Sequence, residues 1–163
     1  MPNQPRSQPA ALAFDRDEWE LLVTLPRRVL MAAVATAPVD GRHAAEGIAG
    51  IEAIASGLAS SSSLVREVVG SIYAENHREP EHLVGDAGVV QTLAACRYAS
   101  EVLAARCAPD DAAAYRDWLS HIAAVVTGVA QGVAQGASGA PPSGRVGLAE
   151  SRFLYALGGV LRP

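Results

Sequence analysis

Apolar side chains recur every three or four residues along most of this 163-residue chain, the spacing that places them on one face of an α-helix. The longest such stretch begins at Pro109 and continues to Gly136. No segment shows the sustained alternation of apolar and polar residues, bounded by hairpin turns, that is typical of strands. The pattern therefore predicts an all-α fold, a single compact bundle of six or seven helices.

Capping and turn residues divide this pattern into separate helices. Asp15 and Glu18 have the spacing of a capping box at the first helix start. Phe14 and Trp19 are placed as the hydrophobic staple beside it. Pro26 then interrupts the helix, so we expect a kink or a fresh start there. Further helices are expected at about residues 43–59, 64–73, 86–106, 109–136 and 148–161.

The chain is expected to consist of a leader and one domain. Residues 1–13 are broken by prolines and lack the apolar core of a signal peptide, which predicts a disordered leader. Residues 14–163 form the all-helical domain, with a length that suits one hydrophobic core.

Two expectations concern the residues that face the core. The larger apolar residues of segment 43–59 should point inward, namely Ile48, Ile51, Ile54, Ala55 and Leu58. Interior glycines cost helix stability, so Gly128 and Gly132 require an explanation. We expect another helix of the domain to cross closely at these two glycines. The open alternative is a small-residue face for self-association, whereas Gly136 is a candidate helix stop.

Charge and composition exclude several classes of function. The net charge is −4, and no basic cluster is larger than the pair Arg27 and Arg28, so we expect no nucleic-acid binding. No apolar run approaches the roughly 20 residues of a transmembrane helix. Peripheral membrane contact stays possible, because it requires only an exposed amphipathic face. Cys96 and Cys107 are expected to be reduced, which favours a cytoplasmic protein.

The sequence contains few clusters of residues that could bind a metal or catalyse a reaction. Asp117 and His121 stand four residues apart on one helix face, as metal ligands or a carboxylate and imidazole for base catalysis would. We interpret them as a hydrogen-bonded polar pair at the edge of the bundle, because no third ligand accompanies them. Segment 75–85, with two histidines and several glutamates, matches no structural zinc spacing and is expected to be a polar loop. Ser60–Ser63 lack the context of a nucleophilic serine.

One layout occurs twice, as a weak two-fold internal repeat. ATAPVDGRHAAEGIAGIEAIA contains an apolar helix, a D-G turn and a helix that opens with Glu46. VAQGASGAPPSGRVGLAESRFLYAL repeats this order, with Glu150 near the third helical position. At that position a glutamate can reach back to the helix start, where Gly147 would be the cap.

On these residues the chain resembles the TerB-type domain associated with bacterial tellurite resistance. The segments FDRDEWELLVTLPRRVLMAAVATA and APDDAAAYRDWLSHIAAVVTGVA are also similar to uncharacterised bacterial proteins with that helical plan. The resemblance covers roughly residues 14–161 and implies a bundle of about seven helices with a stress-associated binding role. It also implies a divalent metal bound by acids that correspond to Asp40, Glu46 and Glu150, although Ser143-Gly144-Arg145 replaces the second acidic turn.

The function that we expect is therefore binding or scaffolding without catalysis, in the cytoplasm, with a protein partner or a second copy of the chain. The alternative is a metal-binding protein or metal-dependent enzyme that uses Asp40, Glu46 and Glu150, together with His43.

Overall fold

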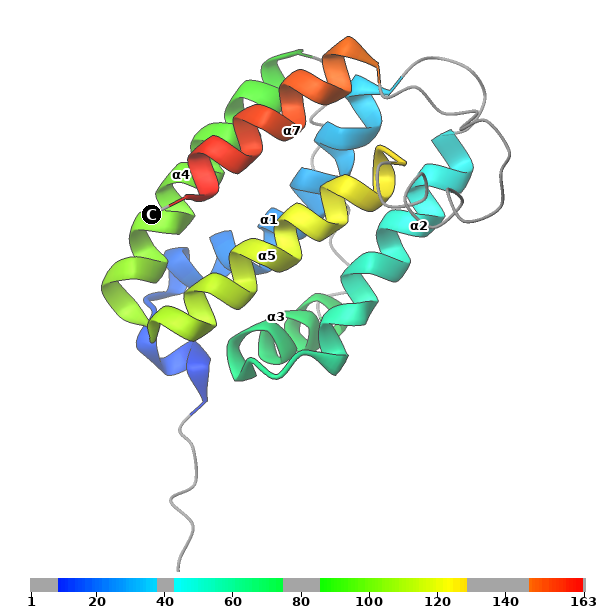
Figure 1. Ribbon diagram of the computed structural model, residues 1–163. Helices are drawn as coiled ribbons and strands as arrows, with labels where there is room; N and C mark the ends of the chain where they lie inside the picture. Colours follow the sequence, from blue (N-terminus) through cyan, green and yellow to red (C-terminus); the bar gives the residue numbers. More distant parts are fainter. Residues whose placement is uncertain (1–8, 38–42, 75–85, 129–146, 163) are drawn as a thin grey trace, which may run out of the picture.

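The computed structural model describes residues 9–37, 43–74, 86–128 and 147–162, and this part of the chain is all α as predicted (Figure 1). It contains six α-helices, two short 3-10 helices and no strand. The 3-10 helices are η1 (Ala10–Ala13) and η2 (Gly57–Ala59). The α-helices are α1 (Arg16–Thr36), α2 (His43–Ser56), α3 (Ser63–Ala74), α4 (Asp86–Arg106), α5 (Pro109–Val126) and α7 (Leu148–Leu161).

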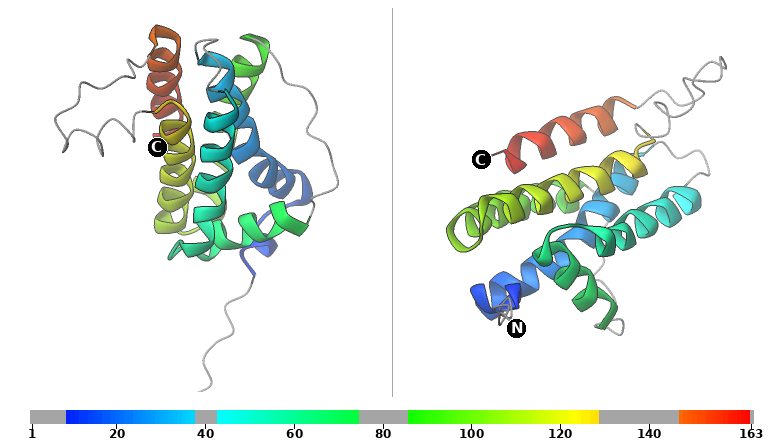
Figure 2. Two further views of the ribbon diagram at one scale, coloured as in Figure 1. Left: turned by 90° about the vertical axis from the view of Figure 1, so that its right-hand side faces the viewer. Right: turned by 60° about the horizontal axis from the view of Figure 1, so that its bottom comes forward.

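The helices pack around α1 and α5, which cross in the middle of the bundle (Figure 1). α4 and α7 lie side by side on one flank, and α2 forms the opposite flank against both central helices. α3 closes the lower end, where it contacts α1 and α5 (Figure 2).

The start of α1 follows the predicted capping chemistry. Asp15 Oδ1 accepts a hydrogen bond from the Glu18 N–H at 2.8 Å, and Glu18 Oε2 accepts one from the Asp15 N–H at 2.9 Å. The rings of Phe14 and Trp19 lie beside this box, with centroids 6.0 Å apart. Glu18 is also paired with Arg106 at the end of α4, at 3.1 Å. The N-terminal end of α1 and the C-terminal end of α4 are therefore joined by one buried carboxylate.

Pro26 neither ends α1 nor begins a new helix. α1 continues as one helix of 21 residues, in which Pro26 is buried. Proline has no N–H to offer the carbonyl of Leu22, the residue four positions earlier. The hydroxyl of Tyr115 on α5 donates to that carbonyl at 2.7 Å instead. A fully buried tyrosine on the crossing helix therefore supplies the hydrogen bond that the proline cannot.

The ordered structure begins before the predicted domain boundary. Residues 10–13, assigned to the leader from the sequence, form η1. Glu67 on α3 accepts hydrogen bonds from the backbone N–H groups of Ala10 and Ala11, one on each carboxylate oxygen, at 2.9 and 3.2 Å. One side chain thus holds the start of η1 against the bundle. Residues 1–8 lie outside the described part of the chain.

α5 is shorter than the predicted helix, and the role predicted for Gly128 is wrong. α5 ends at Val126, and Gly128 follows with a φ of +72°, the left-handed conformation that glycine adopts after a helix. A Cβ on Gly128 would meet no atom within 4 Å, so no helix crosses closely there. Gly128 is the helix stop that was expected at Gly136. Gly132 and Gly136 lie outside the described residues.

The close approach predicted for glycines does occur, but on α2. A Cβ placed on Gly50 would lie 2.5 Å from Leu30 Cδ1 and 2.9 Å from Val126 Cγ2. A Cβ on Gly57 would lie 2.8 Å from Val69 Cγ2 and 2.9 Å from Trp118 Cε2. The absence of side chains at these two positions lets α2 and η2 pack closely onto the rest of the bundle.

This packing overturns the prediction that the large side chains of segment 43–59 face the core. Only Ile54 of that set is buried, together with Ala53, while Ala55 is half-buried. Ile48, Ile51 and Leu58 are 59%, 60% and 52% exposed. Gly50, Ala53 and Gly57 form the face of this segment that packs against the core. The bulky residues lie on other sides of the helix and therefore point outward.

Candidate functional site

The predicted metal ligands do not assemble into a metal site within the described residues. Glu46 lies in the first turn of α2, half-buried, with its Oε2 atom inside the protein. Glu150 is 3% exposed and accepts a hydrogen bond from the Gly147 N–H, which closes the start of α7 as the sequence suggested. Asp40 lies outside the described residues, and nothing is placed for the His43 side chain.

Across the described ranges, no three histidine, cysteine, aspartate or glutamate side chains are grouped to hold a metal ion. The carboxylate of Glu150 has a structural role at the start of α7. The metal site of Asp40, Glu46 and Glu150 stays a prediction, because Asp40 lies outside the described residues. The polar segment 75–85 lies outside the described residues.

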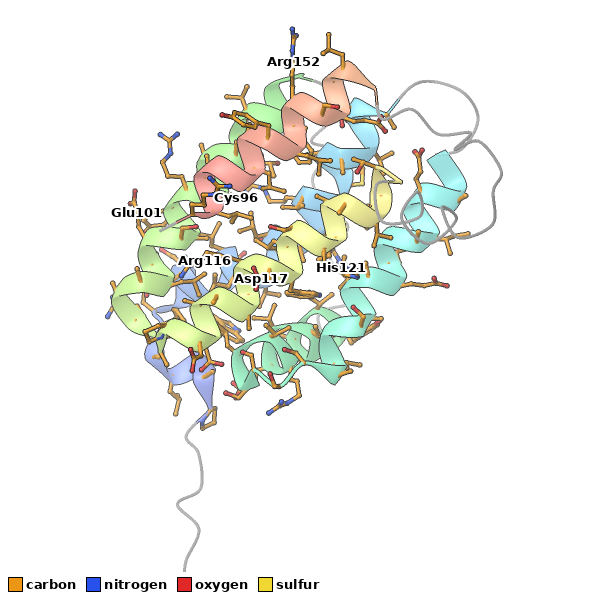
Figure 3. All side chains as sticks on the ribbon, viewed as in Figure 1. Cys96, Glu101, Arg116, Asp117, His121 and Arg152 are labelled. Atoms are coloured by element: carbon orange, nitrogen blue, oxygen red, sulfur yellow. The ribbon has the colours of Figure 1, made fainter. Side chains whose placement is uncertain are left out.

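Asp117 and His121 lie on the exposed side of α5, one turn apart (Figure 3). The structure shows no hydrogen bond or ion pair between these two described side chains. Their neighbour Arg116 instead donates to backbone carbonyls, that of Ala112 at 3.0 Å and that of Leu161 at 3.5 Å. Arg116 thereby ties the end of α7 to α5.

Cys96 is the most deeply buried reactive group. It faces α1 from α4, and burial raises the pKa of its thiol to about 12, although the nearby charge of Arg28 lowers it. Cys107 is half-buried, and burial together with Asp111 also raises the pKa of its thiol. Thiolates are the nucleophilic form of cysteine. Both thiols therefore stay protonated at neutral pH and are poor nucleophiles.

The surface that stands out is on α2. Ile48, Ile51 and Ala55 follow one another at spacings of three and four residues along one side of α2, and Leu58 extends the row three residues later, in the directly following η2. We call these four residues the α2 stripe. Three of them are large aliphatic side chains that are more than half exposed. The stripe spans about three helical turns, or roughly 15 Å, on a helix that forms one flank of the bundle (Figure 2, left).

The charges near the α2 stripe are mixed, because Arg66 donates to the carbonyls of Ser60 and Ser61 just after Leu58. Segment 43–65 contains no arginine or lysine, and its acids are Glu46 and Glu52. Glu52 is exposed and lies next to Ile51 along the helix. The sequence prediction placed these residues in the core, because a buried helix face has the same spacing. The α2 stripe was therefore not predicted as a surface. The signal that could have revealed it is the second row at helical spacing, Gly50, Ala53 and Gly57, which offers an alternative inner face.

Comparison with family models, with curated proteins and with solved structures found no match to this chain. No helix within the described residues is both long enough and apolar enough to cross a membrane.

Proposed function

We propose that this protein is a non-catalytic binding or scaffolding module that presents the α2 stripe to a helix of a protein partner. The observation that carries the proposal is the exposure of Ile48, Ile51 and Leu58 in one row on a well-packed helix. Apolar side chains gathered in one row on a surface are typical of interaction sites, whereas single ones are not.

The partner's shape and charge follow from the stripe. A row at spacings of three and four residues is complementary to the apolar face of an amphipathic helix. Because Glu52 is exposed next to Ile51, in the middle of the row, a partner helix with an arginine or lysine beside that part of its apolar face fits best. In the proposal this partner is a second protein, and a second copy of the chain is the alternative.

The strength of the interaction can be bounded. Full burial of an isoleucine or leucine side chain contributes about 1.5–3 kcal/mol, so covering these half-exposed residues contributes roughly 3–5 kcal/mol together. By itself this corresponds to about millimolar affinity or weaker, before the costs of association. A partner that binds more tightly therefore has to contact surface beyond the stripe.

The test compares Ile51→Glu with the control Val90→Glu. Val90 is 67% exposed on α4, so its substitution adds the same charge at another exposed apolar position. Partners would be captured by cross-linking in cells, and each candidate would then be purified and titrated. We expect Ile51→Glu to weaken the affinity at least tenfold and Val90→Glu to leave it unchanged. Equal affinity of both variants would rule out the stripe as the site, and sedimentation of the purified chain would reveal self-association.

The TerB-type resemblance adds a cellular context to this proposal. A stress-associated role in the cytoplasm follows from that resemblance and from the two reduced thiols. Expression of the gene under oxyanion stress, compared with unstressed growth, would test it.

A further inference from the structure

α7 carries a second exposed surface of a different chemistry. Leu148, Arg152, Tyr155 and Arg162 follow one another at spacings of four, three and seven residues, and so lie on one side of the helix. Leu148 is 69% exposed and Tyr155 is 87% exposed. The opposite side of α7 is fixed in the core through Phe153, Leu157 and Leu161. The helix therefore presents its outer side as a rigid surface.

The charge of this surface is opposite to that of the chain. α4 lies beside α7 (Figure 1). Arg152 and Arg162 have no hydrogen bond or ion pair within the described part of the chain. These two arginines give the outer face of α7 a charge of about +2, although the whole chain carries −4. Figure 3 shows Arg152 pointing away from the bundle.

We propose that the outer face of α7 binds peripherally to an anionic lipid bilayer. Each residue type of this face suits one layer of such a bilayer. Arginine pairs with phosphate headgroups, tyrosine favours the interface, and leucine reaches the first part of the acyl chains. Nucleic acid fits less well, because Leu148 would find no apolar group along a phosphate backbone. The attachment involves side chains only, and the bundle stays folded.

This inference is independent of the α2 stripe, which lies on the other flank of the bundle. The experiment is flotation of the purified full chain with vesicles of phosphatidylcholine alone or with about 30% phosphatidylserine. Each basic residue near an anionic surface contributes about fivefold to partitioning, so a net charge of two predicts about 25-fold stronger binding to the anionic vesicles. Added salt should weaken that binding.

Matched variants decide whether this face is responsible. Arg152→Gln should weaken binding about fivefold, whereas Arg16→Gln removes the same charge from an exposed position at the start of α1 and should have a much smaller effect. Tyr155→Ser should weaken binding about tenfold, whereas Tyr73→Ser, at an exposed tyrosine on α3, should not. Because all four side chains are exposed, the variants are expected to fold, and circular dichroism checks this.

Three outcomes would overturn the inference. These are no flotation with the anionic vesicles, equal flotation with both compositions, and equal losses for Arg152→Gln and Arg16→Gln. The partner titrations with Ile51→Glu do not depend on any of these results, so the two proposals can fail separately.

Discussion

The hydrogen bond between Tyr115 and the Leu22 carbonyl can be tested by a double-mutant cycle. Tyr115→Phe removes the hydroxyl, and Leu22 is left with no donor because residue 26 is proline. A buried carbonyl without a partner costs about 1–3 kcal/mol. Pro26→Ala restores an N–H at the position four residues after Leu22. In the Pro26→Ala background, the carbonyl therefore keeps one donor when the tyrosine hydroxyl is removed.

We expect Tyr115→Phe to cost about 1–3 kcal/mol in the wild-type chain and about 1 kcal/mol or less in the Pro26→Ala chain. The coupling free energy between the two positions should therefore be about 1–2 kcal/mol. Pro26→Ala also removes the packing of the proline ring and adds helix propensity. Both effects cancel from the coupling free energy, because they occur equally with and without the tyrosine hydroxyl. The helix gain itself can reach about 3 kcal/mol.

The measurement is urea unfolding of the four proteins, followed by tryptophan fluorescence and circular dichroism. The slope of free energy against urea should be the same in all four, which shows that only stability has changed. If Tyr115→Phe costs the same in both backgrounds within about 0.3 kcal/mol, the tyrosine does not replace the missing donor. Its burial would then be a matter of packing alone.

Two further predictions concern packing and protonation. Gly57→Ala should destabilise the protein by about 1–3 kcal/mol, because the new Cβ would lie 2.9 Å from the Trp118 ring, whose Nε1 is held by the Ala53 carbonyl. Gly70→Ala, with no atom within 4 Å, should stabilise it by up to about 1 kcal/mol; a rise in the urea midpoint for both variants would contradict the close packing. Burial raises the pKa of Cys96 from 9.0 to about 12, so only the unfolded chain releases this proton between those pH values. The free energy of unfolding should fall on the order of 1 kcal/mol per pH unit there, and Cys96→Ala should show a shallower fall.

Several helix boundaries could be predicted because they depend on neighbouring residues, although the end of α5 at Val126 was not among them. The capping box of Asp15 and Glu18 and the limits of α7 at Leu148 and Leu161 are encoded within a few positions of the chain. The fold class followed from the same local periodicity. These features need no knowledge of distant segments.

The face that each helix buries could not be predicted as well. α2 offers two rows at helical spacing, and the choice between them depends on Leu30, Val126 and Trp118, which come from other helices. Their side chains fill the space above Gly50 and Gly57, so the isoleucines have no room on that side. The candidate binding surface of α2 is a result of this choice, and local sequence does not contain it.

The contact of Glu67 with η1 matters for the design of shortened proteins. A chain begun at Phe14, as the predicted domain boundary suggests, would lose both N–H groups that this carboxylate accepts. Glu67 would then stand half-buried on α3 with an unbalanced negative charge. Crystallisation and binding studies should therefore retain residues 9–13, and a purification tag belongs before Pro9. A protein that begins at the predicted boundary would therefore lack the two hydrogen bonds that join η1 to α3.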